Sequence, residues 1–500
     1  MQADQMTQPA PCADPAPGAQ SPHPPGSGEA LQLAGHMVEA EQAYRQALAK
    51  NPDDVRTLSN YGGMLCMTGH FAQAREVLAR ALTLDRDFAD AWSNMGNALF
   101  RLQLYDDAIA AYQQCLRRNP VNALALSNLG VVLDQRGLYE LAQKFHTAAV
   151  QLTPHNAQTR TNYAVSLLAQ GDYLKGFEEY EWRWNTLASR YNGLNAPLWN
   201  GESFVGRTLL IHTEGGFGDM IQFSRFIPFA ARRGGRTVTS VRPQLLSLLQ
   251  QSFPDQVFVS EDDPVPAHDL QCSVLSLPRA LGTTLDTIPY PQGFLRTDPR
   301  KVAFWAEKLA QDAAGNGVPS GLPGAAGAMR PLRVGLVWAG APHPEIRVAE
   351  QADRHRSTDL ATFAPLAGAV PAALFYSLQV GEKAEQARTP PPGMRLFDHT
   401  ALLHDFSDTA ALVSQLDLVI AVDTSTAHVA AGLGKPTWML SRLEQCWRWL
   451  SGRVDSPWYD SLRIYQQVKP RDWSAPMARI AADLRQFAHA RAGGEQGAPA

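Results

Sequence analysis

The chain has 500 residues, of which 45% are hydrophobic and 18% charged, so it is long enough for two or three domains with apolar cores. Its formal net charge is −4 and it contains no long lysine or arginine run, which argues against a nucleic-acid-binding protein. No apolar run approaches the roughly 18–20 residues that span a bilayer, and the polar, proline-rich start is unlike a secretory signal, so we expect a cytoplasmic protein.

An internal repeat dominates the first part of the chain. Asparagines, small residues and mid-unit alanines each recur every 34 residues, at Asn60, Asn94, Asn128 and Asn162; Gly62, Gly96, Gly130 and Ala164; and Ala40, Ala74, Ala108 and Ala142. Pro52, Pro120 and Pro154 close three of the units. This pattern resembles the tetratricopeptide repeat, in which each unit is a pair of antiparallel helices. One unit cannot bury its apolar face alone, so the units are expected to stack into a solenoid.

Strand and helix patterns alternate after Trp184. Residues 207–213 (RTLLIHT) read as a buried strand and residues 219–232 as a helix. Residues 238–241, 257–260 and 274–277 read as further short strands. Alternation of this kind predicts βαβ units and a mostly parallel sheet.

A stretch rich in glycine, proline and alanine, residues 315–331, then interrupts the pattern and reads as a linker. The alternation restarts beyond it. Strands are predicted at 334–338, 373–378, 418–422 and 437–440, and helices at 408–415, 426–433 and 475–491. Two doubly wound lobes joined by a linker predict a ligand-binding cleft.

The first candidate motif is EGGFGD, residues 214–219, which follows the first strand and opens a helix. Gly215, Gly216 and Gly218 allow a sharp turn and bring backbone N–H groups close to a ligand. A tight turn without a ligand is the alternative. A nicotinamide enzyme is disfavoured because no third glycine follows and Arg242, not an acidic residue, ends the next strand.

The second candidate motif is VIAVDTSTAHVAAGLGKP, residues 419–436. Asp423, Thr424 and Ser425 end an apolar strand, and His428 lies in the first turn of the helix that follows. These side chains offer donors and acceptors to a ribose or a phosphate at the carboxyl end of the strand. An ordinary capped helix with a structural histidine remains the alternative.

Two further groups complete the candidates. Arg354 and Arg356 lie after the first strand of the second lobe and could grip a diphosphate, and Gln379 ends the next strand on the same edge. A solvated basic loop is the alternative for the arginines. The aromatic cluster of Trp447, Trp449, Trp458 and Tyr459 could stack on a base or sugar, although packing against the sheet is favoured.

These motifs together carry a family resemblance. Residues 195–473, with GGFGDMIQFSRFIP, VGLVWAG, DRHRS, YSLQ, DTSTAHVAAGLGKPTW and DSPWY in this order, resemble the heptosyltransferase-type (family 9-like) GT-B glycosyltransferases. The whole chain is similar to bacterial fusions of tetratricopeptide repeats with such a transferase domain. The resemblance implies metal-independent transfer of a sugar from a nucleotide donor, with no cofactor because the nucleotide-sugar is a co-substrate.

The resemblance also assigns roles. It makes Asp219 the general base and places the donor nucleotide against Asp423, Thr424, Ser425 and His428. It puts a basic residue, Arg354 or Arg356, on the donor phosphates, although the family's lysine is missing here. The remaining candidates for nucleotide-sugar binding are Gly215, Gly216, Gly218, Gln222 and Gln379. No DxD motif ends a strand and the five cysteines form no CxxC pair, so no metal site is predicted.

The expected fold class is an N-terminal α-solenoid of tetratricopeptide repeats followed by a GT-B-type pair of Rossmann-like lobes. The expected parts are a disordered N-terminus (1–28), the repeats (29–186), a first, acceptor-side lobe (187–314), a linker (315–331), a second, nucleotide-sugar lobe (332–492) and a disordered tail (493–500). The expected function is a glycosyltransferase whose repeats recruit a protein or glycan acceptor. The alternative is a non-catalytic scaffold with a degenerate transferase fold.

Overall fold

A computed structural model of the chain describes residues 24, 26–186, 194–315, 330–341 and 353–492. The segments expected to be disordered (1–28 and 493–500) and the expected linker (315–331) lie wholly or mostly outside these ranges. The chain divides into two compact units, one of N-terminal helices and one from residue 192 onward, and each is described by itself.

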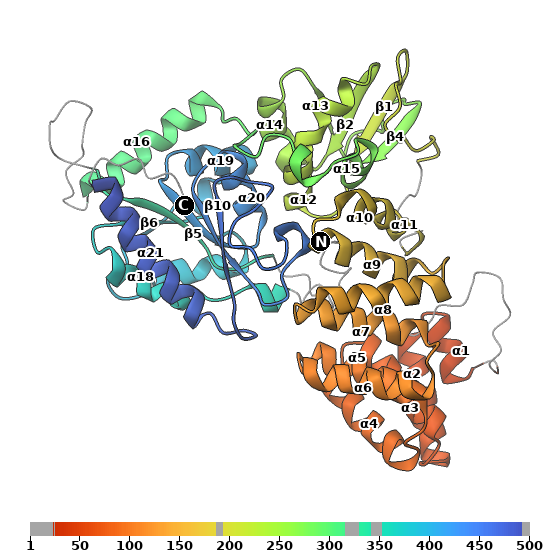
Figure 1. Cartoon of the computed structure of the whole chain (residues 1–500). Coiled ribbons are helices and arrows are strands. Elements are labelled where there is room, and N and C mark those ends of the chain that lie inside the picture. The colour runs from red at the N-terminus through yellow and green to blue at the C-terminus, as the bar shows by residue number, and fades with distance from the viewer. Residues whose placement is uncertain (1–23, 25, 187–193, 316–329, 342–352, 493–500) are drawn as a thin grey trace. The chain divides into compact units, whose positions relative to one another are not determined.

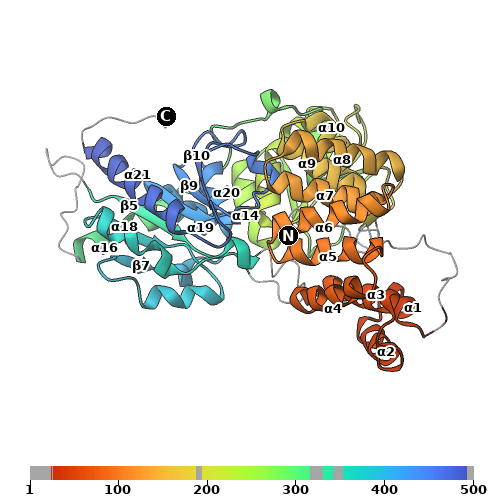
Figure 2. The ribbon, with the colours of Figure 1, turned by 60° about the horizontal axis from the view of Figure 1, so that its bottom comes forward.

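The N-terminal unit is a stack of antiparallel helices in chain order (Figure 1, Figure 2). The helices are α1 (Gly28–Leu33), α2 (Met37–Lys50), α3 (Val55–Met67), α4 (Phe71–Leu84), α5 (Ala89–Arg101), α6 (Tyr105–Arg118), α7 (Ala123–Gln135), α8 (Tyr139–Leu152), α9 (Ala157–Ala169), α10 (Tyr173–Tyr180) and α11 (Arg183–Thr186). Asp54, Asn122 and Asn156 follow the periodic prolines by two residues, and their side chains cap α3, α7 and α9. The helical repeat predicted from the sequence is confirmed.

The periodic glycines lie where two helices come closest. A Cβ atom on Gly62, Gly96 or Gly130 would stand 2.5, 2.5 or 2.7 Å from a side chain of the following helix. Gly28 keeps the same period, and a Cβ there would stand 2.5 Å from the ring of Tyr44. The structural repeat therefore begins at α1, one residue before the boundary expected from the sequence.

The periodic asparagines join successive units. Asn94 Nδ2 donates a hydrogen bond to the backbone oxygen of Ser59 at 3.1 Å, and Asn162 Nδ2 donates to Ser127 Oγ at 3.0 Å. Both asparagines are buried. Because a buried amide without a partner is costly, these bonds favour one fixed spacing between neighbouring units.

The second unit begins with a lobe built on a parallel sheet, residues 194–298, here called the N-terminal lobe. Its strands lie in the order β3 (Val257–Ser260), β2 (Arg236–Val241), β1 (Thr208–His212) and β4 (Leu270–Ser273). Its helices are α12 (Phe217–Phe223), α13 (Ile227–Ala231), α14 (Pro243–Ser252) and α15 (Leu277–Ala280).

One predicted strand of this lobe is wrong. Residues 274–277 form a short 3₁₀ helix and the start of α15, and the strand lies just before them as β4. The apolar run turns into helix because Ser273 Oγ accepts a hydrogen bond from the N–H of Leu275 at 3.1 Å and Pro278 lies in the first helical turn.

Residues 330–341 and 353–492 form the C-terminal lobe around a second parallel sheet. Its strands lie in the order β10 (Leu462–Gln466), β9 (Thr437–Ser441), β8 (Leu418–Val422), β5 (Arg333–Val337), β6 (Leu374–Ser377) and β7 (Leu396–Asp398). Its helices are α18 (Ala364–Ala369), α19 (Phe406–Ser414), α20 (Ser425–Gly432) and α21 (Ser474–Ala492), and α16 (Pro299–Gly315) packs on the same lobe. The parallel sheets predicted from the sequence are confirmed, while β7 and β10 had no counterpart in the prediction.

Helices cover both faces of the C-terminal sheet (Figure 1). Leu418, Ile420 and Val422 of β8 pack with α18 and α21, whereas the alternating Val419 and Ala421 pack with α16, α19 and α20. A strand buried on both faces reads as a continuous apolar run, which is why β8 is predictable to the residue.

Strand order reverses beside the first strand of each sheet. β1 lies between β2 and β4, and β5 lies between β6 and β8. Loops that leave neighbouring strands toward opposite faces open a crevice at the carboxyl edge of such a sheet. The EGGFGD turn follows β1 and the DTSTAH segment follows β8, so both candidate motifs stand at these reversal points.

Candidate active site

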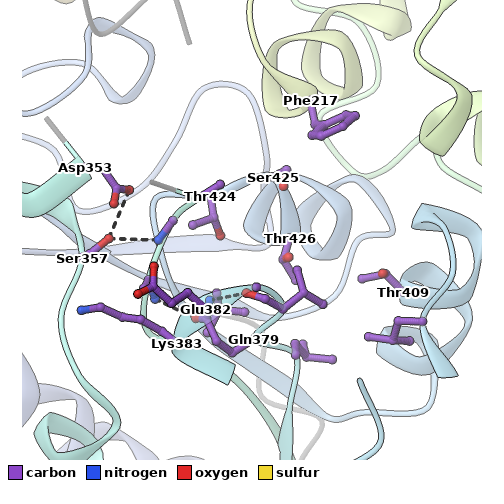
Figure 3. Close-up of a pocket in the computed structure, with 18 of the residues that line it drawn as sticks. Phe217, Asp353, Ser357, Gln379, Glu382, Lys383, Thr409, Thr424, Ser425 and Thr426 are labelled. Carbon is purple, nitrogen blue, oxygen red and sulfur yellow. Dashed lines mark hydrogen bonds between the residues drawn. The ribbon is translucent and has the colours of Figure 1, made fainter. Parts of the chain in front are cut away.

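A cavity of about 770 Å³ opens at the carboxyl edge of the C-terminal sheet (Figure 3). Residues that follow β5, β6 and β8 line it, among them Ala339, Gly340, Gln379, Thr424 and Ser425. Its volume lies within the range of about 300–1,000 Å³ that small-molecule sites occupy. The reversal of strand order at β5 therefore creates a candidate ligand site.

The first turn of α20 faces this cavity, which Thr424, Ser425 and Thr426 all line (Figure 3). Thr424 is the N-cap residue, but its Oγ1 donates to the backbone oxygen of Val422 at 3.1 Å and makes no capping hydrogen bond to the helix. The N–H groups of a first helical turn have no partner within the helix, and the helix end favours negative charge. An anionic group in the cavity would be stabilised here.

Gln379 lines the cavity, but its side-chain amide is already hydrogen-bonded to the backbone. Its Oε1 accepts hydrogen bonds from the N–H groups of Trp338 at 3.0 Å and Ala339 at 2.8 Å. Its Nε2 donates to the backbone oxygen of Val380 at 3.0 Å. Gln379 thus fixes the loop that follows β5 and shapes the cavity wall.

The two candidate arginines separate in the structure. Arg354 is exposed and lines the cavity. Arg356 lies outside the set of lining residues: its Nε pairs with Asp353 Oδ1 at 3.0 Å and its Nη1 donates to the backbone oxygen of Asp423 at 3.4 Å. Arg356 therefore supports the end of β8, and Arg354 is the arginine placed to meet a ligand.

Lys383 is a cavity residue that the sequence analysis missed (Figure 3). Its Nζ donates to the backbone oxygen of Thr358 and to Asp359 Oδ1, both at 3.0 Å. Lys383 is the lysine among the residues that line this cavity, and it comes from a different segment than the two candidate arginines. The signal was its place in YSLQVGEK, four residues after Gln379.

Phe217 brings the N-terminal lobe to the rim of the cavity, where it lies across from Ser425 (Figure 3). Its ring centroid is 5.0 Å from that of Phe406 in the C-terminal lobe, and the guanidinium of Arg242 lies 5.0 Å above the Phe217 ring. Phe217 was not among the site residues predicted from the sequence, although it lies within the EGGFGD motif.

Asp219 lies two residues beyond Phe217, in the first turn of α12, and is buried. Its Oδ2 accepts the N–H of Gly216 at 2.7 Å, and its Oδ1 pairs with the guanidinium of Arg448 from the C-terminal lobe. Burial opposes ionisation of Asp219, whereas the charge of Arg448 and the Gly216 N–H favour it, and the net effect lowers the pKa of the carboxyl group. Asp219 is therefore an ionised carboxylate with both oxygens engaged.

His428 faces the glycine turn and does not line the cavity. Its Nδ1 lies 2.9 Å from Tyr459 Oη, and its ring stacks on Trp449 at 5.3 Å. Burial, reinforced by the charge of Arg448, lowers the pKa of His428 to about 3, so the ring is neutral at physiological pH. A Cβ on Gly218 would stand 2.8 Å from the imidazole, so only glycine permits this approach.

The other two glycines of the turn, Gly215 and Gly216, make room for the Asp219 carboxylate and donate a hydrogen bond to it. Gly215 adopts a φ of +79°, a conformation that favours glycine, and a Cβ there would collide with the Asp219 carboxylate. Gly216 supplies the N–H described above. Gln222, one turn later, is buried, and neither polar atom of its side chain has a partner among the described residues.

Asp423 is held by the aromatic cluster. Trp449 Nε1 donates to Asp423 Oδ2 at 2.9 Å. Trp447, Trp449, Trp458 and Tyr459 are all buried, as the packing interpretation expects. Asp219, His428, Arg448, Trp449 and Tyr459, here called the interlobe cluster, thus lie together where α12 meets α20, and Asp423 borders the cluster.

The described part of the chain holds neither a metal-binding cluster nor a membrane-spanning helix. No group of three or more His, Cys, Asp or Glu side chains is arranged to hold a metal ion within these residues. None of the helices in the described ranges is long and apolar enough to cross a membrane.

Comparison with known proteins identifies the N-terminal unit. Two models of the tetratricopeptide repeat match residues 31–99 and residues 89–122. The chain therefore carries tetratricopeptide repeats in its N-terminal part. Because such arrays bind peptides or protein segments in their grooves, this part of the chain is a protein-binding module.

Relatives and solved structures resemble parts of the chain. Protein FlbA of Caulobacter vibrioides is 26% identical over 347 residues, which cover 64% of this chain and 54% of FlbA, so the chain spans about half the length of that curated relative. The crystal structure of MamA (23% identity, TM-score 0.27) covers 33% of this chain and 96% of its own. A thermophilic repeat protein of Thermus thermophilus (18% identity, TM-score 0.31) covers 33% and 90%.

Proposed function

We propose that the second unit is a glycosyltransferase that binds a nucleoside diphosphate sugar in the cavity beside α20. The observation that carries the proposal is the position of this cavity, at the reversal point of a parallel sheet and against the first turn of α20. Strand-end crevices of this kind are common nucleotide sites. The GT-B resemblance of the two lobes supports the same assignment.

The cavity walls differ in chemistry, as a nucleotide-sugar requires. Phe406, Leu403 and Trp473 offer apolar surface to a base. Ser425 and Thr426 offer hydroxyls, and the start of α20 favours an anion. The cations Arg354, Lys383 and Arg471 also line the cavity and could neutralise a diphosphate without a metal.

The proposed reaction is a displacement at the anomeric carbon of the donor sugar. The acceptor hydroxyl oxygen forms a bond to that carbon as the bond to the diphosphate oxygen breaks, and the electron pair leaves with the nucleoside diphosphate. Asp219 takes the acceptor proton, which requires an ionised carboxylate. Phe217, two residues before Asp219, lines the cavity, and we infer that the sugar extends from the cavity toward Asp219.

The tetratricopeptide array would recruit the acceptor. Repeat arrays bind extended peptides or partner helices, so a protein or a protein-linked glycan is the acceptor class that fits. In this proposal the repeats supply substrate choice and the α/β unit supplies the chemistry.

One observation favours the alternative, a non-catalytic scaffold with a degenerate transferase fold. Both oxygens of Asp219 are engaged and the side chain is buried, which restricts its access to an acceptor. A scaffold of this kind would still bind protein partners through the repeats. It would not release nucleoside diphosphate from a sugar nucleotide.

Calorimetry of the full chain against UDP-, GDP-, ADP- and dTDP-sugars tests the proposal. We expect one nucleotide class to bind, and we expect Ser425→Trp to abolish that binding because the indole would fill the cavity. Ser203→Trp, at an exposed position of the N-terminal lobe, is the control. Failure of every sugar nucleotide to bind the intact protein would favour the scaffold.

A further inference from the structure

One short turn contacts carboxylates from both lobes. The turn is the 3₁₀ helix Trp447–Trp449. Arg448 pairs with Asp219 of the N-terminal lobe, and the adjacent Trp449 donates to Asp423 at the end of β8. Trp449 therefore links the turn that carries Arg448 to the carboxyl end of β8. The helix α20 and one wall of the cavity begin at this strand end.

The Arg448 guanidinium is held in a defined plane. Its side chain is 4% exposed and lies 4.5 Å from the ring centroid of Trp447 and 5.6 Å from that of Phe223. An arginine packed against aromatic rings has less freedom to reorient its donors. The Asp219 carboxylate is consequently fixed by Arg448 on one oxygen and by Gly216 on the other.

Two bonds on two different oxygens do not saturate a carboxylate. An ionised carboxylate offers about four lone-pair sites, which is more than the bonds from Gly216 and Arg448 occupy. The pair therefore restricts rotation of the carboxylate without removing its ability to accept a proton. Fixed orientation of a base matters because a displacement of about 1 Å can lower a rate on the order of 100-fold.

We propose that Arg448 is a positioning residue for the sugar transfer: from the C-terminal lobe it orients the Asp219 carboxylate of the N-terminal lobe toward the acceptor. The inference rests on the proposed function, because a base needs orienting only if transfer occurs. It goes beyond that function by assigning a role to a residue outside both candidate motifs.

The charges that face Asp219 predict how this role appears in a pH profile. Arg448 faces it from the turn, the neutral His428 faces it from α20, and the Gly216 N–H faces it from its own loop. Loss of the Arg448 charge would raise the pKa of Asp219, so the base would become protonated at a higher pH. The acid limb of the rate profile would move upward.

The experiment measures release of nucleoside diphosphate by the full chain, with water as acceptor, from the UDP-, GDP-, ADP- or dTDP-sugar that binds. Arg448→Met should lower kcat on the order of 100-fold, leave KM within about twofold and shift the acid limb upward. Arg448→Lys keeps the charge and loses the planar fork, so the acid limb should stay in place while kcat falls roughly tenfold. Arg453→Met, which breaks an exposed pair with Asp455 in the same segment, is the matched control.

The outcomes separate the two proposals. Release by the wild-type chain with an unmoved acid limb in Arg448→Met, or with raised KM and normal kcat, would overturn the role of Arg448 and leave the transferase intact. If Arg448→Met does not fold, normal kcat in Arg448→Lys would overturn it as well. A wild-type chain that neither binds nor cleaves any donor of the panel removes the proposed function, and the role of Arg448 with it.

Discussion

Arg448 and Asp219, 229 residues apart in the sequence, form a buried ion pair between the two α/β lobes. Removing one member of a buried pair leaves an uncompensated charge, which typically destabilises a protein by about 3–5 kcal/mol. The pair therefore links two properties that are usually measured separately, the association of the lobes and the state of the proposed base.

The Asp219→Asn variant tests the proposed base separately from donor binding. The amide keeps the shape of the side chain but cannot take a proton, so we expect nucleoside diphosphate release to fall at least about 100-fold. The donor dissociation constant should change less than twofold because Asp219 does not line the cavity. Calorimetry and product release measure the two quantities on the same sample.

Asp262→Asn is the matched control, because Asp262 is an exposed aspartate of the same lobe. Near-normal turnover in Asp219→Asn would remove Asp219 from the role of base.

The position of Arg354 in the cavity wall predicts a role for this residue in donor binding. Arg354→Met removes an exposed cation from the cavity wall and should weaken binding of the nucleoside diphosphate by about tenfold, with little effect on stability. Arg300→Met, an exposed arginine at the start of α16, serves as its control. Equal dissociation constants for the two variants would place the phosphates elsewhere.

His428 predicts a dependence of stability on pH. Burial lowers its pKa to about 3, whereas a histidine in an unfolded chain titrates near ~6.5. Between these values the unfolded chain binds a proton that the folded chain does not, so stability falls as the pH drops through this window. His428→Asn keeps a polar partner for Tyr459 and should remove up to about 1.4 kcal/mol per pH unit of this slope.

The midpoint of thermal unfolding, followed between pH ~5 and ~7.5, measures this slope. The exposed His489→Asn is the matched control. Parallel pH profiles for wild type and His428→Asn would contradict a buried neutral His428.

Two helical glycines, one in the repeats and one in the C-terminal lobe, predict opposite effects of the same substitution. Gly96→Ala places a Cβ 2.5 Å from the buried Tyr112 ring, so it should destabilise α5 and α6 by about 1–3 kcal/mol. Gly368→Ala, in α18, meets no atom within 4 Å and should stabilise its helix by up to about 1 kcal/mol. Amide hydrogen exchange of the two regions distinguishes these outcomes.

The repeat and the central strands could be predicted from the sequence because their signals are local. A 34-residue period needs only pattern matching, and the apolar run of β8 is confined by polar neighbours on both sides. The edge strands β7 and β10 were missed because an edge strand packs fewer apolar side chains and its pattern is weaker. The strand expected at 274–277 failed because Ser273 and Pro278 favour a helix start over continued extension.

The site could be predicted only in part, for a different reason. Thr424, Ser425 and Gln379 line the cavity because strand-end positions are set by the order of the elements, and Arg354 lines it as well. That Arg448 pairs with Asp219, and that His428 turns to Tyr459, depends on how two lobes pack, which no local pattern encodes. The resemblance placed His428 on the donor nucleotide, and the structure places it in the interlobe cluster.

Because Gly218 has no side chain, its position limits which mutations this protein can tolerate. The imidazole of His428 occupies the space that a single methyl group would need, so α12 and α20 meet at a separation that tolerates no added atom. Loops at the cavity rim can vary in length and alter which molecule fits. A mutation at Gly218 would instead wedge the two lobes apart, so we expect variation among descendants of this protein to collect at the rim and to avoid this contact.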